Sequence, residues 1–145
     1  MVLDHMDDRM AAALARLLPQ VSSRAAPLTV ERAREVVGSS STHVAVACRG
    51  DEVLAMGLLV TCTTLAGQFG LVEEVAVDES ARGHHLGVRV MVHLVTLAKT
   101  LDLDFVELTS RPAREAANGL YQSIGFRRRE INVYRHDLEE LPELR

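Results

Sequence analysis

The stretch VDESARGHHLGVRVMVHL, from Val77 to Leu94, decides the fold of this chain. It leaves an apolar, strand-like run, passes two glycines, Gly83 and Gly87, and enters a long apolar segment. Glycine lets a turn come close to a ligand, and the first amides of a helix attract anions. Arg82 adds a permanent positive charge. The stretch therefore predicts a strand, a turn suited to a pyrophosphate, and a helix.

The same residues allow two other interpretations. Glycines also occur in ordinary strand-to-helix turns, and adjacent histidines can suggest a metal site. Histidines 84 and 85 point in different directions at a helix start, and no cysteine or carboxylate follows one turn later, so we expect no metal. The glycine spacing fits neither the Walker loop nor the dinucleotide-binding fingerprint.

Composition predicts one globular domain, residues 1–145, with 48% hydrophobic and 25% charged residues. A net charge of -4 and only 3% aromatic residues argue against nucleic acid as a partner. No segment approaches the ~20 apolar residues of a membrane span, and residues 1–10 lack the apolar core of a signal peptide. Cys48 and Cys62 lie in apolar runs, which favours buried, reduced thiols. We expect a cytoplasmic protein without a membrane partner.

Periodicity predicts two helices at the start of the chain. Met6, Met10 and Leu17 lie on one face of the first, and Thr29 caps the second, which ends at Gly38. Three strands follow, HVAVAC (43–48), VLAMGLLVTC (53–62) and FGLVEEVAV (69–77), the first two joined as a hairpin.

The second half of the chain alternates helices and strands. LGVRVMVHLVTLAKT (86–100) is long enough for a helix, DFVELT (104–109) reads as a strand, AREAANGLYQSI (113–124) as a helix, and RRREINVYRHDL (127–138) as a last extended segment. The expected fold is mixed α/β (α+β), in the order α-α-β-β-β-α-β-α-β, with helices on both faces of the sheet.

Two motifs carry a resemblance to a known family. Residues 82–87 resemble the acetyl-CoA loop of the GNAT superfamily of N-acetyltransferases, Q/R-x-x-G-x-G/A, with His85 in place of its first glycine. REAANGLYQSIGF (114–126) resembles the family's N-x-x-A-x-x-L-Y-x-x-x-G-F signature, with Arg114 in place of its asparagine. The strand 69–77 resembles the family's fourth strand, and Gly57 stands at a glycine position of its third. The resemblance covers about residues 42–138 and implies a mostly antiparallel central sheet.

The resemblance implies direct transfer of an acetyl group from acetyl-CoA to a primary amine in a ternary complex, without a metal. The strand around Val75 is expected to diverge from the strand 104–109, so that its backbone pairs with the pantetheine arm and polarises the thioester carbonyl. The implied cofactor-binding residues are Val75, Ala76, Val77, Arg82, Gly83, His84, His85, Leu86, Gly87, Val88, Arg114 and Tyr121.

Two side chains are implied to carry the chemistry. Tyr121 matches the family tyrosine that protonates the departing thiolate, although its spacing alone also suits a core aromatic residue. Glu73 is expected to take the proton of the amine, directly or through water. Strand alternation places Glu73 and Glu74 on opposite faces, and Glu74 is expected to be an exposed strand carboxylate.

The C-terminal segment is short for the family, and some short relatives exchange their last strand across a dimer. We therefore expect a homodimer that uses residues 132–138. The acceptor remains open among amino sugars, amino acids, polyamines and protein amines. An alternative function is an acyl-CoA-binding sensor or scaffold without turnover, which the departures at His85 and Arg114 favour and Tyr121 opposes.

Overall fold

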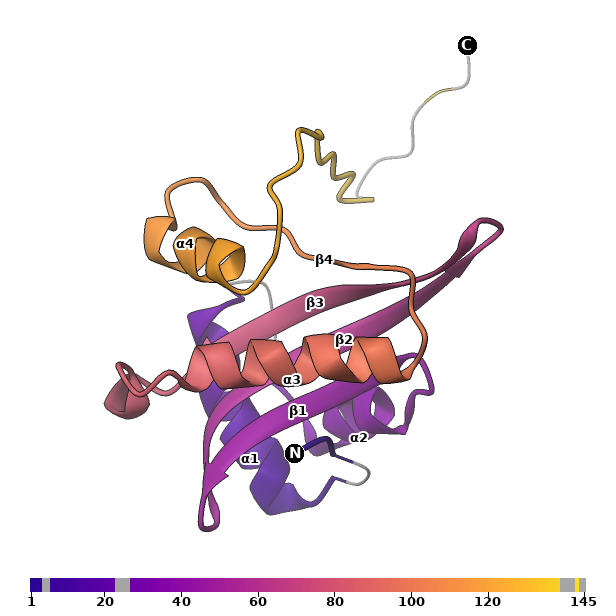
Figure 1. Ribbon diagram of the computed structural model, residues 1–145. Helices are drawn as coiled ribbons and strands as arrows, with labels where there is room; N and C mark the ends of the chain where they lie inside the picture. Colours follow the sequence, from indigo (N-terminus) through magenta and orange to yellow (C-terminus); the bar gives the residue numbers. More distant parts are fainter. Residues whose placement is uncertain (4–5, 23–26, 139–142, 144–145) are drawn as a thin grey trace.

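The computed structural model describes residues 1–3, 6–22, 27–138 and 143. In them a four-stranded sheet carries helices on both faces (Figure 1). The elements are α1 (Asp8–Leu17), the 3₁₀ turn η1 (Leu18–Gln20), α2 (Val30–Gly38), β1 (Thr42–Arg49), β2 (Glu52–Thr64), β3 (Gly67–Val77), the 3₁₀ turn η2 (Glu79–Ala81), α3 (Leu86–Thr100), β4 (Val106–Glu107) and α4 (Glu115–Ser123).

The sheet is mixed and mostly antiparallel, which confirms the expected fold class. Its strand order is β1-β2-β3-β4. The expected hairpin joins β1 to β2, with Arg49 opposite Glu52, and β2 pairs antiparallel with β3. β4 pairs parallel with β3, because α3 carries the chain back to the same end of the sheet.

Two apolar cores lie on the two faces of the sheet. Figure 1 shows α3 in front of the sheet and α1 and α2 behind it. Alternation along β1 supplies both cores: Val44 and Val46 face α1 and α2, and Ala45 faces α3. The buried helix residues are Ala11, Leu14 and Leu17 of α1, Ala33 of α2, and Val90, Met91, Leu94 and Ala98 of α3.

The helices follow the sequence signals closely. α3 spans the predicted residues Leu86–Thr100. The Thr29 hydroxyl accepts a hydrogen bond from the Arg32 amide at 3.1 Å and caps α2 as expected. α4 is three residues shorter than predicted and ends before Gly125, whose φ of 101° only glycine adopts without strain.

A β-bulge interrupts β3 at the two adjacent glutamates. Glu73 pairs with Leu58 and Ala76 with Met56, so Glu74 and Val75 together oppose Gly57. Glu74 has a φ of 51°. A Cβ on Gly57 would lie 2.8 Å from Val90 Cγ1 and 3.2 Å from Val75 Cγ2, so glycine there lets α3 pack closely over the bulge. The simple alternation predicted for this strand is therefore wrong from Glu74 onward, and Glu74 is half-buried where we expected an exposed carboxylate.

The last predicted strand does not form in the described residues. Residues 127–138 have no regular structure, and β4 is two residues long instead of six. A strand needs a neighbour to pair with, and β4 is too short to serve as one. The large apolar side chains of the segment, Ile131, Val133, Tyr134 and Leu138, are 58% to 87% exposed.

The burial predicted for the cysteines is wrong for Cys48. Its residue is exposed beside an irregularity at Ala47/Cys48 in the edge strand β1, whereas Cys62 is half-buried. Both thiols are free. In the described part of the chain, no helix combines the length and apolar character needed to cross a bilayer.

Candidate active site

The loop from Asp78 to His85 brings the chain from β3 into α3. Asp78 caps η2, since its Oδ1 accepts hydrogen bonds from Ser80 N at 2.9 Å and Ser80 Oγ at 2.7 Å. His85 is the N-cap of α3 and makes no side-chain cap hydrogen bond. The first amides of α3 therefore lack a capping side chain and are suited to an anion.

The backbone of the loop explains its glycine pattern. Gly83 has a φ of 85°, and His85 has a φ of 59°, in the left-handed region that glycine prefers. Histidine holds this conformation at a cost of about 1 kcal/mol, so His85 replaces the family glycine without changing the backbone. A Cβ on Gly87 would meet only Val77 Cγ2, at 3.6 Å, which leaves room beside the helix start.

The side chains of the loop are mostly open to solvent. Arg82, His84 and His85 are exposed, and Leu86 to Val88 are half-buried. Arg82 Nη2 donates to Gln20 Oε1 of η1 at 3.2 Å. In the described ranges, no group of three or more His, Cys, Asp or Glu side chains is placed to hold a metal ion.

β3 and β4 pair over a very short distance. The pairs are Gly70 with Val106 and Leu71 with Glu107. β3 continues to Val77, whereas the chain beyond Glu107 leaves the sheet toward α4 (Figure 1). The pairing of β3 with β4 therefore ends before the bulge in β3.

Tyr121 lies on α4, the helix that follows β4 in the chain. Its ring is half-buried, packs against the core under α3, and meets the ring of Phe126 edge-on at a centroid distance of 6.2 Å. Arg114 is the exposed N-cap of α4 and gives no side-chain cap hydrogen bond. Asn118 Nδ2 donates to the Arg111 carbonyl at 3.1 Å and holds the turn before the helix.

The structure brings some of the predicted residues together and separates others. Val75, Val77, Leu86 and Tyr121 pack against the same core, on the α3 face. Ala76 belongs to the core under α1 and α2. Glu73 is exposed and pairs with Leu58, whose side chain contacts that second core. Directly opposed residues share a face, so Glu73 and Tyr121 lie on opposite faces of the sheet.

The family model described as "Acetyltransferase (GNAT) family" matches residues 9–126. This chain belongs to the GNAT acetyltransferase family. No curated protein matches its sequence closely enough to count as a relative.

Solved structures share this GNAT fold at low sequence identity. An aminoglycoside acetyltransferase, meta-AAC0020, from an uncultured soil metagenomic sample superposes with a TM-score of 0.82, 13% identity and coverage of 96% of this chain and 95% of the other. Glucosamine-6-phosphate N-acetyltransferase from Arabidopsis thaliana superposes with a TM-score of 0.74 and 19% identity, covering 94% of this chain and 97% of the other. Ribosomal-protein-alanine N-acetyltransferase from Brucella melitensis biovar Abortus 2308 superposes with a TM-score of 0.74 and 17% identity, covering 95% of this chain and 98% of the other.

Two features near this candidate site are not predicted by the sequence. Arg16 of α1 forms an ion pair with Asp78, whose side chain is only 13% exposed. The Asp78-x-Ser80 pattern is a capping signal, but no local pattern indicates a partner 62 residues away. Ser110 Oγ, between β4 and α4, is buried without a hydrogen-bond partner among the described residues.

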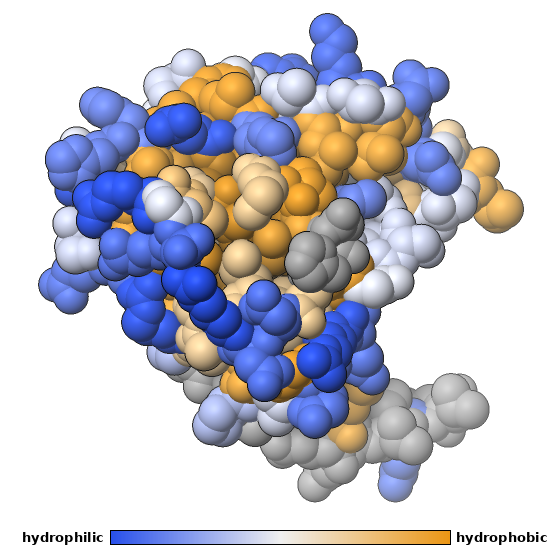
Figure 2. Space-filling view, turned by 90° about the horizontal axis from the view of Figure 1, so that it is seen from below, coloured by the Kyte–Doolittle hydropathy of each residue, from blue (hydrophilic) through white to orange (hydrophobic). Residues whose placement is uncertain are grey.

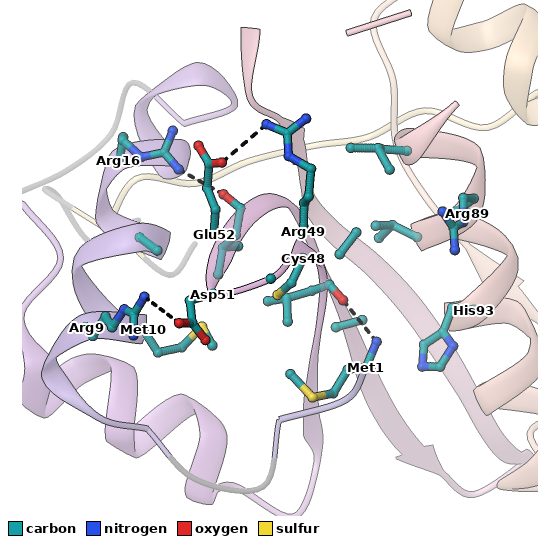
Figure 3. A pocket seen from close by; sticks show the side chains of 18 of the residues that line it. Met1, Arg9, Met10, Arg16, Cys48, Arg49, Asp51, Glu52, Arg89 and His93 are labelled. Atoms are coloured by element: carbon teal, nitrogen blue, oxygen red, sulfur yellow. Dashed lines mark hydrogen bonds and ion pairs between the residues drawn. The ribbon is translucent and has the colours of Figure 1, made fainter. Parts of the chain in front are cut away.

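An open groove of about 1100 Å³ lies at the other edge of the GNAT sheet. Met1 and Leu3 hydrogen-bond along β1 only as far as Val46, and beyond them the groove separates α1 from α3. Figure 3 shows Arg89 and His93 of α3 on one side and Arg9 and Met10 of α1 on the other. The lining includes Leu86 at the start of α3 but no residue of β3, β4 or α4, so the groove meets the candidate active site only at that helix start.

Proposed function

We propose that the chain is an N-acetyltransferase that moves an acetyl group from acetyl-CoA to a primary amine by direct attack in a ternary complex. The observation that carries the proposal is the α3 amino terminus, which has no side-chain cap and follows the end of β3 that does not pair with β4. Family membership supports acetyl transfer as the reaction. We further propose that residues 1–145 act as one domain.

The residues of the loop suit the diphosphate of coenzyme A. Amides from His85 to Val88 and the exposed guanidinium of Arg82 would hold the phosphates, with Gly83, His84 and Leu86 shaping the turn. A Cβ at Gly87 would meet only one atom within 4 Å, so the helix start is open beside it. Backbone groups of Val75, Ala76 and Val77 would pair with the pantetheine arm, and Arg114 would reach its other side from the start of α4.

The reaction needs one proton removed and one supplied. An alkylammonium with a pKa near ~10.4 must lose a proton before its nitrogen attacks, and Glu73 takes that proton directly or through water. The new C–N bond forms as the C–S bond breaks, and the Tyr121 hydroxyl protonates the departing sulfur. Because Glu73 and Tyr121 belong to opposite faces, donor and acceptor would approach β3 from opposite faces of the sheet.

The names of the structural neighbours support an amine acceptor. They are acetyltransferases of an aminoglycoside, of glucosamine-6-phosphate and of the alanine of a ribosomal protein. At identities of 12% to 22% the likeness shows the fold alone, so the acceptor class is a matter for experiment. Amino sugars, amino acids, polyamines and peptide amines form the panel to test.

The test compares Tyr121→Phe with Tyr134→Phe, which changes the only other tyrosine, 87% exposed. Thiol release from acetyl-CoA with the amine panel measures kcat, and calorimetry measures donor binding. We expect Tyr121→Phe to lower kcat by about 100-fold or more with binding intact, since general acids contribute that much, and Tyr134→Phe to match wild type. Undiminished turnover in Tyr121→Phe excludes its acid role. Binding without turnover across the panel supports the sensor function instead.

We also propose a homodimer formed through residues 132–138. The exposed Val133, Tyr134 and Leu138, and the short β4 that Arg129 contacts through Glu107 at 2.8 Å, support pairing with a second copy. A mass in solution that stays monomeric at all concentrations argues against it. Two free thiols are compatible with the reducing cytoplasm that we propose as its location.

A further inference from the structure

Asp78 lies at the junction between β3 and the phosphate loop and is held from three directions. Its amide donates to the Leu54 carbonyl of β2 at 2.7 Å. Its carboxylate accepts two hydrogen bonds from Ser80, which form the η2 turn. The same carboxylate forms an ion pair with Arg16 of α1. The position of this one carboxylate therefore sets where the loop starts.

Arg16 is itself fixed by a second contact. Its Nη2 donates to the Val53 carbonyl at 2.8 Å, as Figure 3 shows beside the hairpin of β1 and β2. The guanidinium thus connects α1, the hairpin and Asp78.

The face seen from below in Figure 2 has apolar side chains in its middle and hydrophilic ones around most of its rim.

Burial distinguishes this ion pair from its neighbours. The Asp78 side chain is 13% exposed, whereas the carboxylates paired with Arg9 and Arg34, Asp51 and Asp8, are 84% and 85% exposed. Exposed pairs contribute little because water screens them, and removing one partner of a buried pair is costly. The Arg16 side chain is 47% exposed, so water screens the pair in part, but the nearly buried Asp78 carboxylate would lose its partner if the contact were broken.

A second contact joins the helical arm, which consists of α1 and η1, to the loop. Gln20 of η1, which directly follows α1, accepts a hydrogen bond from Arg82 at 3.2 Å. The two contacts join Arg16 and Gln20 to the beginning and end of the segment 78–82. This arm packs on one face of the sheet, and the loop feeds α3 on the other.

We propose that Arg16 and Asp78 are a positioning pair through which α1 holds the phosphate loop in the shape that binds coenzyme A. The inference rests on the proposed function, because it assigns the loop to the donor. When the pair is broken, η2 and the loop populate other conformations. The apparent affinity then falls in proportion to the binding-competent fraction, whereas kcat at saturating donor is preserved.

The experiment measures coenzyme A binding by calorimetry, and KM and kcat for acetyl-CoA, in wild type, Asp78→Asn and Asp78→Ala. Asparagine keeps an oxygen that can accept from Ser80 and removes the charge that Arg16 needs; alanine removes both. We expect affinity roughly tenfold weaker in Asp78→Asn, weaker still in Asp78→Ala, and kcat within about twofold of wild type. Asp51→Asn breaks the exposed pair with Arg9 on the same helix and serves as the matched control, with unchanged affinity.

Hydrogen exchange of the amides 79–86 reads the position of the loop without the donor. We expect faster exchange there in Asp78→Asn and not in Asp51→Asn. Gln20→Ala, at an exposed position, gives a smaller loss of affinity and keeps the idea testable if the Asp78 variants fail to fold. Wild-type affinity and exchange in Asp78→Asn and Gln20→Ala overturn the positioning role. If the wild type does not bind coenzyme A but the amides 79–86 still exchange faster in Asp78→Asn than in the wild type, the proposed function alone is overturned.

Discussion

α3 and α4 both carry a motif of the candidate site, yet they are attached to the molecule very differently. α3 buries Val90, Met91, Leu94 and Ala98 against the sheet, whereas no residue of α4 is fully buried. The loop half of the site is therefore part of the main core. The tyrosine half rests on partly buried contacts and leads into a segment with exposed apolar side chains. Folding of the main core therefore fixes the loop proposed to bind the donor, whereas the position of Tyr121 depends on weaker contacts.

The largest expected effect comes from the same truncation made in both helices. Leu94→Ala removes a side chain that is 0% exposed, so we expect a loss of about 2–5 kcal/mol in the free energy of unfolding. Leu120→Ala in α4 removes a half-buried side chain, and we expect about 1 kcal/mol. Denaturant titrations measure both. Equal losses would remove the distinction between the two helices.

The next effect uses a glycine under α3 and a glycine within α4. Gly57→Ala places a Cβ 2.8 Å from Val90 Cγ1, so we expect a loss of about 1–3 kcal/mol from overpacking. Gly119→Ala meets nothing within 4 Å and improves helix propensity, so stability should rise by up to about 1 kcal/mol. Thermal melts measure the stability of the two variants. A Gly57→Ala protein as stable as wild type would contradict the close packing over the bulge.

A third change separates stability from binding at the start of α3. A Cβ on Gly87 lies at an ordinary 3.6 Å from Val77 Cγ2, so Gly87→Ala should fold as well as wild type, or up to about 1 kcal/mol better. The methyl group takes the room proposed for the diphosphate, and we expect coenzyme A affinity roughly tenfold lower, the loss of about one charged hydrogen bond. Calorimetry measures it, with Gly119→Ala as the control that keeps its affinity. Unchanged binding in Gly87→Ala argues against the loop as the phosphate site.

The smallest effect belongs to the C-terminal segment. Val133 is 70% exposed, so Val133→Ser should change the unfolding free energy of a dilute sample by less than about 0.5 kcal/mol. If the segment pairs with a second copy, the same variant shifts the dissociation of the dimer to higher concentration. Sedimentation over a concentration series reads this, and a large loss of stability in the dilute monomer would show that Val133 packs within its own chain.

Much of the fold follows from local patterns. The period of the apolar residues from Leu86 to Thr100, the Thr29 cap and the turn between Arg49 and Glu52 each act over a few residues, and each forms as predicted. The two family motifs also predict where in the chain the loop and Tyr121 of the candidate site lie. These features depend on the order of residue types along a short stretch, which a sequence displays directly.

Other features depend on what lies opposite in space. The bulge at Glu74 fits beneath α3 because Gly57 on the next strand has no Cβ, and it places Val75 on the α3 face and Ala76 on the face of α1 and α2. The last strand has the composition of a strand but no described neighbour to pair with, and composition cannot supply one.

The sequence by itself determined the helix after the glycine loop, the hairpin and the family to which the chain belongs. The pairing of Arg16 with Asp78, the exposure of Cys48 and the faces of Val75 and Ala76 depend on the tertiary structure. The physical reason is distance along the chain: periodicity acts between neighbours, whereas ion pairs and strand register join residues that only folding brings together.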